Sequence, residues 1–369
     1  MNYCDFVLPS LVTQPVYEPG KPIEQTAREW GIAEESICKM ASNETIYGVS
    51  PRVRKVFEQF FDQIHRYPDG GSSSLINTLS QFHALDQDQF IIGNGSNEII
   101  ELVAKAVVRP GVEVVMGADA FPVYFLITLL YGGLPVRIPM PNYRHDLEAM
   151  HKAINDQTRL VFIASPNNPT GRANPRQEII EFIESLPSNV ICCLDQAYTE
   201  YQNPEDQVDV VSLIQKGYKV MGFRTFSKIY GLAGLRIGYG FGQQEWIAIL
   251  QRTRQPFNVN SLAQLAAEAA LGDHDFVGKV RIENRKNLIK LQSLLQEAGF
   301  SLVESDANFV LVPISNARDG FEYLQKRGFI VRPITLKDGS TALRITVEKV
   351  DKMEKLVSTL TAWRSFSRT

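Results

Sequence analysis

The sequence predicts an α/β protein with a large domain built on a mostly parallel sheet and a small α+β domain after it. From about residue 90, short apolar runs alternate with segments of helical length. Several of these runs are apolar on both faces, which is typical of parallel strands covered by helices. From about residue 300, the pattern changes to short strands interleaved with helices, which is typical of a separate α+β unit.

Seven apolar runs are the predicted strands of the large sheet. In chain order they read QFIIGNG, VEVVMG, LPVRIPM, TRLVFIASP, NVICCLD, YKVMGF and GLRIGYGFG. Segments such as SNEIIELVAKAVV and RQEIIEFIESL are long enough to be the crossover helices that parallel strands need. The last run follows YKVMGF too closely for such a crossover, so we expect it to be antiparallel.

The segments before and after these strands have other sequence patterns. The first 40 residues are rich in proline, and we expect an irregular arm rather than a packed element. SPRVRKVFEQFFDQIH has helical apolar spacing and a Ser-Pro start, and a helix-rich stretch covers about 244–298. After it, FVLVPI, FIVRPI and TALRITV are expected to be strands. We therefore predict an arm with part of the small domain over 1–40, a large domain over 41–270 and a small domain over 271–369.

The composition argues against nucleic acid and membranes as partners. The net charge is −3, and lysines and arginines are scattered. The N-terminus shows no basic segment followed by an apolar one, so we expect no signal peptide and a cytoplasmic protein. The apolar stretch FPVYFLITLLYGGLPV is too short and too interrupted for a membrane span, which favours a buried helix. The 5 histidines form no ligand pair, so no metal site is predicted.

Residues suited to an anion follow the first predicted strand. Gly95, Ser96 and Asn97 lie in GNGSNE, which opens a helix. Glycine lets the backbone approach an anion closely, and the free N–H groups of the helix can hold a phosphate. An ordinary serine helix cap explains the same residues equally well.

Two further strands also end in polar residues. SPNNPTG forms a rigid turn in which Asn167 and Asn168 can donate to a ligand, with an ordinary tight loop as the alternative. Asp195 is the first charge after NVICCL. A carboxylate at the end of a buried strand needs a cationic partner, because it would otherwise be protonated.

Lys228 is the most unusual residue, because small, hydroxylated and apolar residues surround it in RTFSKIYGLAGLRIGYG. A lysine that forms a Schiff base must be deprotonated near neutral pH, which burial and a nearby cation such as Arg236 promote. Thr225 and Ser227 supply hydroxyls for a phosphate beside it. With Asp195 as partner for a ring nitrogen, these residues make the set that a pyridoxal phosphate site needs.

The motifs SPNNPTG, DQAY, RTFSKIYGLAGLRIGY and RQPFNVNSLAQ resemble those of the fold-type I, aspartate aminotransferase-like pyridoxal phosphate enzymes. Within that group the chain is most similar to the histidinol-phosphate aminotransferases, from about Tyr17 to about Val347. The resemblance implies a homodimeric pyridoxal phosphate-dependent aminotransferase. It also implies amino transfer between L-histidinol phosphate and 2-oxoglutarate, in histidine biosynthesis.

The resemblance also assigns roles to individual residues. Lys228 matches the lysine that carries the cofactor and acts as general base, and Asp195 matches the partner of the ring nitrogen. Phe121 matches the aromatic that stacks on the ring. The residues matched to the phenolic oxygen are Tyr198 and Asn168, and those matched to the phosphate and its surroundings are Gly95, Ser96, Asn97, Thr225, Ser227 and Arg236.

The substrate residues come from the same resemblance. Arg344 matches the arginine that meets the anionic group of the substrate, because a guanidinium grips such groups with two hydrogen bonds. The further positions matched to the substrate pocket are Arg332, Asn43 and Tyr17. Tyr67 matches a tyrosine that reaches the site of the neighbouring subunit. For the arginines an ion pair on a strand face is the alternative, and for Tyr17 it is a role in anchoring the arm.

Three departures from the histidinol-phosphate enzymes affect the predicted substrate more than the predicted cofactor. Thr45 and Ile46 replace the usual Asn and Pro, and Gln196 replaces the usual Glu of DEAY. The loop over 335–340 lacks the usual tyrosine-glycine pair. An aminotransferase for aromatic amino acids or for a specialised pathway therefore stays open. So do a decarboxylase and a non-catalytic effector-binding module.

Overall fold

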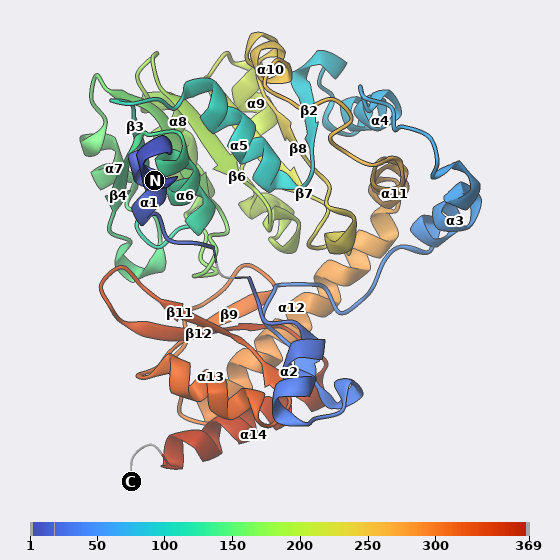
Figure 1. Ribbon diagram of the computed structural model, residues 1–369, viewed down its shortest axis with the longest axis vertical. Coiled ribbons are helices and arrows are strands. Elements are labelled where there is room, and N and C mark those ends of the chain that lie inside the picture. The colour runs from blue at the N-terminus through green and yellow to red at the C-terminus, as the bar shows by residue number, and fades with distance from the viewer. Residues whose placement is uncertain (1–2, 18, 367–369) are drawn as a thin grey trace.

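A seven-stranded sheet forms the centre of the larger part of the molecule (Figure 1). The structure is a computed structural model that describes residues 3–17 and 19–366. The strands, in the spatial order β2-β8-β7-β6-β5-β3-β4, are β2 (Phe90–Gly93), β8 (Gly238–Phe241), β7 (Val220–Thr225), β6 (Ile191–Asp195), β5 (Thr158–Ala164), β3 (Glu113–Gly117) and β4 (Leu134–Ile138). β8 is antiparallel to β7 and β2, and the other pairs are parallel. The predicted mostly parallel sheet with an antiparallel last strand is confirmed.

Helices cover both faces of this sheet. Neighbouring residues of β3 point to opposite layers, since Val115 packs in one hydrophobic core and Val114 in the other. One layer contains α4 (Ser73–His83), α7 (Leu147–Ala153), α8 (Arg176–Ser185), α9 (Val210–Gln215) and α11 (Ser261–Leu271). The other contains α5 (Ser96–Val107), α6 (Pro122–Leu130) and α10 (Gln244–Gln251). The apolar stretch around α6 is therefore a helix packed on the sheet. Among the described residues, no helix has both the length and the apolar character needed to cross a membrane.

A smaller part lies below the large sheet in Figure 1. Its antiparallel sheet has the order β11-β12-β9, and it is packed against three helices. These elements are β9 (Phe309–Pro313), β11 (Arg332–Thr335), β12 (Thr341–Thr346), α12 (His274–Glu297), α13 (Ala317–Gln325) and α14 (Val350–Phe366). The run FIVRPI, expected to be one strand, divides between two sheets. β10 (Phe329–Ile330) pairs in parallel with β1 (Cys38–Lys39), whereas β11 pairs with β12.

The helix α12 connects the two parts. Val280 belongs to the core under the large sheet, while Leu288 and Leu291 belong to the core of the smaller part. One continuous helix thus contributes side chains to both cores. The domain limits at 40 and 270 stay a prediction.

The N-terminal region corrects one expectation. Besides the short α1 (Pro9–Thr13), it contains α2 (Ile23–Trp30), in which Ala27 is buried against Ile330. The prediction that no packed element lies here was wrong. Pro22 directly precedes the helix instead of breaking one, and Gly31, with a φ of +64°, ends it in a left-handed conformation.

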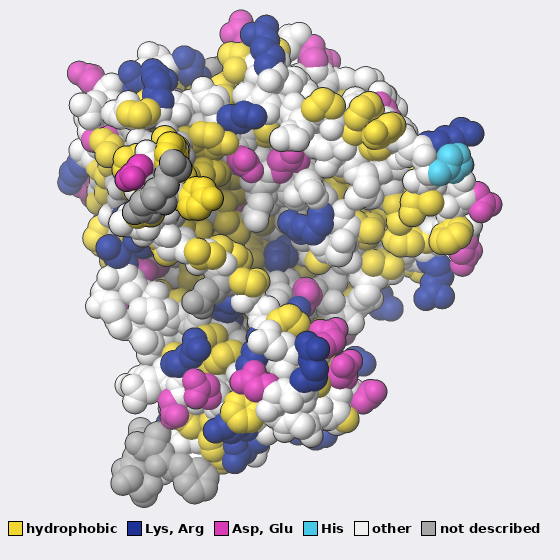
Figure 2. Space-filling model, in the orientation of Figure 1, with side chains coloured by type: hydrophobic (Ala, Val, Ile, Leu, Met, Phe, Trp, Pro, Cys, Tyr) yellow, Lys and Arg dark blue, Asp and Glu magenta, His cyan; other side chains and the backbone are white. Residues whose placement is uncertain are grey.

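The helix α3 (Pro51–Phe60) begins as predicted, since the Ser50 hydroxyl accepts a hydrogen bond from the Arg52 N–H at 3.0 Å. Its apolar face is only partly covered. Phe57 and, just after the helix, Phe61 and Ile64 are exposed. Figure 2 shows hydrophobic side chains gathered on this side of the molecule.

Candidate active site

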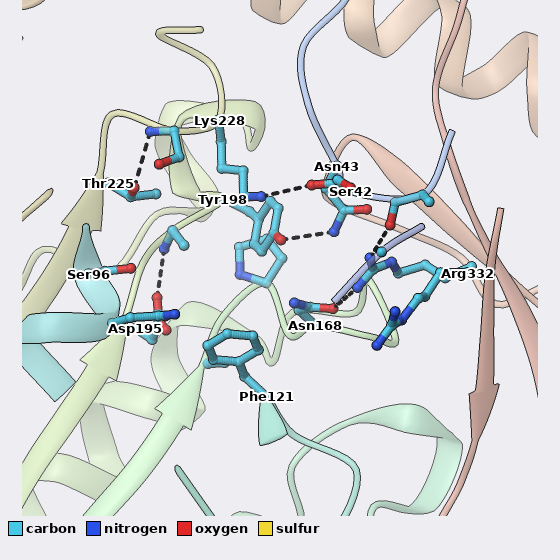
Figure 3. Close-up of a pocket in the computed structure, with 18 of the residues that line it drawn as sticks. Ser42, Asn43, Ser96, Phe121, Asn168, Asp195, Tyr198, Thr225, Lys228 and Arg332 are labelled. Carbon is cyan, nitrogen blue, oxygen red and sulfur yellow. Dashed lines mark hydrogen bonds between the residues drawn. The ribbon is translucent and has the colours of Figure 1, made fainter. Parts of the chain in front are cut away.

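A cavity of about 190 Å³ lies where the two parts of the molecule meet. The carboxyl ends of β5, β6 and β7 face it, which is the edge at which open α/β sheets bind ligands. Strands β11 and β12 line it from the smaller part. All but three of the residues predicted from the sequence line it (Figure 3): Tyr17, Asn43, Ser96, Asn97, Phe121, Asn168, Asp195, Tyr198, Thr225, Ser227, Lys228, Arg236, Arg332 and Arg344.

Lys228 extends into the cavity from the loop after β7. Its Nζ donates to the Ser42 carbonyl at 3.2 Å and lies 5.5 Å from the centre of the Tyr198 ring. Burial, and after it the positive charge of Arg344, lowers the pKa of Lys228 from 10.5 to about 7. About half of the amines are therefore neutral at pH 7, as nucleophilic attack on a carbonyl requires.

Asp195 is the last residue of β6 and is 6% exposed. One carboxylate oxygen accepts from the Tyr124 hydroxyl at 2.6 Å, and the other accepts from the Ala197 N–H at 3.0 Å. Burial raises the pKa of Asp195, and these two hydrogen bonds oppose the rise. Because both donors are neutral, the carboxylate is suited to a cationic ligand group such as a protonated ring nitrogen.

An anion cradle lies at the N-terminus of α5, where Ser96 is the first helical residue. A Cβ atom at Gly95, which has a φ of +78°, would lie only 2.6 Å from Nη2 of Arg236. The guanidinium of Arg236 also donates to the Ser227 hydroxyl at 3.3 Å. The Thr225 hydroxyl accepts from the Ser227 N–H at 3.1 Å. Hydroxyls, helical N–H groups and one guanidinium thus converge, which is the donor set that a phosphate needs.

Two side-chain donors face the space between the cradle and the smaller part. Arg344 donates to Oδ1 of Asn168 at 2.5 Å, which leaves the amide nitrogen of Asn168 available to a ligand. The Tyr198 hydroxyl is bonded to Nδ2 of Asn43 at 2.9 Å. Asn43 was predicted as a substrate residue, but it is 1% exposed and its side chain is engaged with Tyr198.

The predicted substrate arginines lie side by side on neighbouring strands of the small sheet. Arg332 on β11 is the register partner of Arg344 on β12. Arg344 is 9% exposed and also donates to the Ala41 carbonyl at 2.6 Å. Burial lowers the pKa of Arg344, and Arg332 adds to that effect. Two guanidinium groups this close favour a ligand that carries more than one negative charge.

A second cavity, of about 280 Å³, adjoins the first. Both arginines and the rings of Tyr17 and Phe121 border both cavities. Its other walls combine apolar side chains with two charged groups, and they include Met116, Asp119, Phe125, Arg137, Ile334 and Leu336. A ligand in the first cavity can therefore extend a side chain into the second.

Three predicted residues lie outside the first cavity. Asn167 is buried, and its amide nitrogen donates to the Asp119 carbonyl and to the Thr170 hydroxyl, both at 3.0 Å. Gly95 has no side chain to line the cavity, and its contribution is to leave room for the guanidinium of Arg236. Tyr67 is 83% exposed, and its ring stacks on Phe257 with centroids 4.9 Å apart. It follows the exposed Phe61 and Ile64 by a few positions in the sequence, and it does not line the cavity of its own chain.

The cavity also contains residues that the sequence did not indicate. Tyr124 supplies the hydroxyl for Asp195, and Ser42 supplies the carbonyl for Lys228. Tyr124 lies in the first turn of α6 and follows Phe121, the residue before that helix, by three positions, so spacing from a predicted site residue was the available signal. Ser42 acts through its backbone, for which residue type gives no signal. Within residues 3–17 and 19–366, no cluster of His, Cys, Asp or Glu is arranged to hold a metal ion.

Comparison with known proteins identifies the family. The sequence model of aminotransferase class I and II matches residues 35–360. The chain belongs to the aminotransferase class I and II family. This family uses pyridoxal phosphate, so the predicted cofactor and the predicted type of enzyme are confirmed.

Three relatives of this aminotransferase show how far the similarity extends. It is 38% identical over 361 residues to histidinol-phosphate aminotransferase 2 of Nitrosospira multiformis, covering 98% of this chain and 92% of that one. It is 42% identical over 347 residues to histidinol-phosphate aminotransferase 1 of Dechloromonas aromatica, covering 94% and 95%. The crystal structure of histidinol-phosphate aminotransferase from Sinorhizobium meliloti with pyridoxal-5'-phosphate matches with a TM-score of 0.90 at 26% identity, covering 98% of each chain. The fold-type I architecture is therefore confirmed.

Proposed function

We propose that this aminotransferase transfers an amino group from L-histidinol phosphate to 2-oxoglutarate, in histidine biosynthesis. The observation that carries the proposal is the pair of arginines, Arg332 and Arg344, at the junction of the two cavities. Histidinol phosphate has a phosphate where an amino acid has its carboxylate, and two adjacent guanidinium groups suit a dianion better than a single one does. The names of the relatives at 38–42% identity support the same substrate.

The residues around the first cavity fit pyridoxal phosphate. Ser96, Thr225, Ser227 and Arg236 would hold its phosphate, with Gly95 and Asn97 beside them. Asp195 would pair with its ring nitrogen, Phe121 would stack on the ring, and Tyr198 and Asn168 would donate to its phenolic oxygen. When bound, the cofactor supplies an electron sink for the charge that develops at the substrate Cα.

The protein's own residues then bind the substrate and move its proton. Lys228, with its pKa lowered to about 7, takes the proton from Cα of the amino donor through Nζ. Arg344 must bind the phosphate of the donor in one half-reaction and a carboxylate of 2-oxoglutarate in the other. Because Arg344 also holds Asn168, substrate binding and the orientation of that amide are coupled.

We further propose a cytoplasmic homodimer in which Tyr67 completes the partner's site. Phe57, Phe61, Ile64 and Tyr67 are all exposed within one short stretch of the chain, and a second copy of the chain would cover them. Mixing inactive Lys228→Ala protein with inactive Tyr67→Ala protein tests this arrangement. A mixed dimer would regain one native site, so activity should return after subunit exchange. No recovery in mixtures shown to contain mixed dimers would exclude a shared site.

An aminotransferase for aromatic amino acids is the second candidate, and the apolar side chains that line part of the second cavity, Met116, Phe125 and Ile334, favour it. The loop over 335–340, which departs from the usual histidinol-phosphate pattern, borders this cavity, and the Lys337 N–H donates to Asp119 at 2.7 Å. Gln196, another departure, donates to the Val208 carbonyl at 3.0 Å and is absent from both cavity linings.

Titration of the purified holoenzyme distinguishes the two candidates. The absorbance band of the lysine-bound cofactor should disappear when the true amino donor converts the enzyme to its pyridoxamine form. Conversion at much lower concentrations of histidinol phosphate than of phenylalanine supports our proposal, and the reverse order supports the aromatic candidate. Lys228→Ala is the control that should show no conversion with either donor.

A further inference from the structure

Asn43 is held in a left-handed backbone conformation by hydrogen bonds to two different segments. Its φ is +55°, in the left-handed region that only a few residue types tolerate. Its backbone N–H donates to the Thr346 hydroxyl at 3.0 Å, and its carbonyl accepts from the Asn308 amide at 3.0 Å. Thr346 ends β12, and Asn308 directly precedes β9, so the smaller part of the molecule clamps this residue.

The clamp determines which way the protons of this cluster point. A backbone N–H can only donate, so the Thr346 oxygen must accept from Asn43. The single proton of Thr346 is then directed to Oδ1 of Asn43, 3.2 Å away. With Oδ1 occupied as an acceptor, the amide nitrogen of Asn43 is the atom that faces the Tyr198 oxygen at 2.9 Å, and it donates.

The same reasoning extends to Tyr198. Its hydroxyl has one proton, and its oxygen already accepts from Asn43. The proton must therefore be donated to something other than Asn43. The Tyr198 ring is fixed by an edge contact with Phe309, with centroids 5.3 Å apart, and its hydroxyl borders the cavity (Figure 3).

We infer that Thr346, acting through Asn43, is a positioning residue that makes Tyr198 a hydrogen-bond donor to the ligand in the cavity. The inference rests on the proposed contact between Tyr198 and the phenolic oxygen of the cofactor. A hydrogen bond donated by Tyr198 to this oxygen has one specific chemical consequence. A donor stabilises the anionic form of that oxygen, so it lowers the pH at which the lysine-bound cofactor loses its proton.

Other charged groups near Tyr198 are common to every variant compared below. They are Arg344 from β12 and Asp195 from β6, with Tyr201 as a further titratable neighbour, while Lys228 from the loop after β7 is itself the lysine bound to the cofactor. Because the substitutions leave these groups in place, a change in the titration reports the hydrogen-bond chain itself.

The test is a pH titration of the absorbance of the holoenzyme with Thr346→Val and its matched control Thr346→Ser. Without the hydroxyl, the Asn43 amide is free to turn its oxygen to Tyr198, which would then donate to Asn43 instead of to the cofactor. Thr346→Val should raise the midpoint by about 0.5 to 1 pH unit, the size expected for one lost hydrogen bond. Thr346→Ser keeps the hydroxyl and should leave the midpoint unchanged.

Tyr198→Phe separates this inference from the proposed role of Tyr198. That variant should raise the midpoint, and adding Thr346→Val to it should cause no further rise, because the two changes act through one bond. A raised midpoint in Tyr198→Phe with a native midpoint in Thr346→Val overturns the inference alone. A native midpoint in Tyr198→Phe overturns the proposed contact and the inference with it. If Thr346→Val fails to fold, Thr346→Ala carries the same expectation.

Discussion

Replacing Lys228 by methionine should stabilise the protein without cofactor, and the gain should depend on pH. Burial lowers the pKa of Lys228 to about 7, whereas the unfolded chain has the ordinary value of 10.5. The unfolded state therefore binds more protons between these two values, and the stability of the native protein rises with pH across this window. Below pH 7 the charged amine carries the full penalty of burial.

The size of this gain in stability follows from how far the pKa of Lys228 is lowered. A difference of 3.5 pH units, from 10.5 to about 7, corresponds to at most about 5 kcal/mol, since each unit is about 1.4 kcal/mol. Water in the cavity reduces this figure. Methionine also loses the hydrogen bond from Nζ to the Ser42 carbonyl, which costs about 1 kcal/mol at every pH. The net advantage of the variant should therefore fall by up to about 1.4 kcal/mol for each pH unit above 7.

Urea unfolding of both proteins without cofactor, at one protein concentration and several pH values from 6.5 to 9.5, measures this difference. Lys228→Met should be clearly more stable at pH 6.5, and the two proteins should converge as the pH rises. A stability difference that stays constant over this range would refute the reasoning, because it would mean that Lys228 titrates like an ordinary lysine. Arg344→Gln removes the second cause of the lowered pKa of Lys228, so it should raise the lower limit of the window and leave the upper limit at 10.5.

Three further outcomes are expected. Gly95→Ala should weaken cofactor binding at least about tenfold in equilibrium dialysis, because of the positive φ and the contact with Arg236, whereas Gly234→Ala, whose Cβ would meet nothing within 4 Å, should bind normally. Equal affinities would contradict the cradle. Asp195→Asn should retain the cofactor and lower single-turnover rates by about 10² to 10³, and a near-native rate would remove its assigned role. Tyr124→Phe should move the acid limb of the kcat profile to higher pH, because its hydroxyl lowers the pKa of Asp195 against burial, and an unchanged limb would contradict this.

The parts of the fold and site that could be predicted are those with local signals. The apolar runs predicted the strands, and strand ends predicted where Asp195 and Lys228 would meet, because parallel strands bring their carboxyl ends to one edge. Contacts between distant segments had no such signal. Tyr124 and Asp195 are 71 positions apart, and Asn43 and Tyr198 are 155 apart. Both contacts depend on how layers pack and how the two parts close on each other.

Two other differences between the sequence predictions and the structure, at α2 and α3, have physical causes of their own. The helix α2 was missed because prolines at a helix start and within a loop look alike in a sequence. The apolar residues of α3 were expected to share a face, and they do not show whether that face packs within the chain or against another molecule. Phe57 and Phe61 remain exposed in the single chain.

The clamp on Asn43 has a consequence for engineering new substrate ranges by recombination. A graft of the C-terminal segment that carries Arg332 and Arg344 would separate Thr346 and Asn308 from the backbone they bind, and β10 from its partner β1. The exchangeable unit is therefore discontinuous, since residues 38–43 must come from the same parent as the strands β9 to β12. The join within α12 also has to preserve both cores, so the crossover point belongs after Val280, which packs in the first core, and before Leu288, which packs in the second.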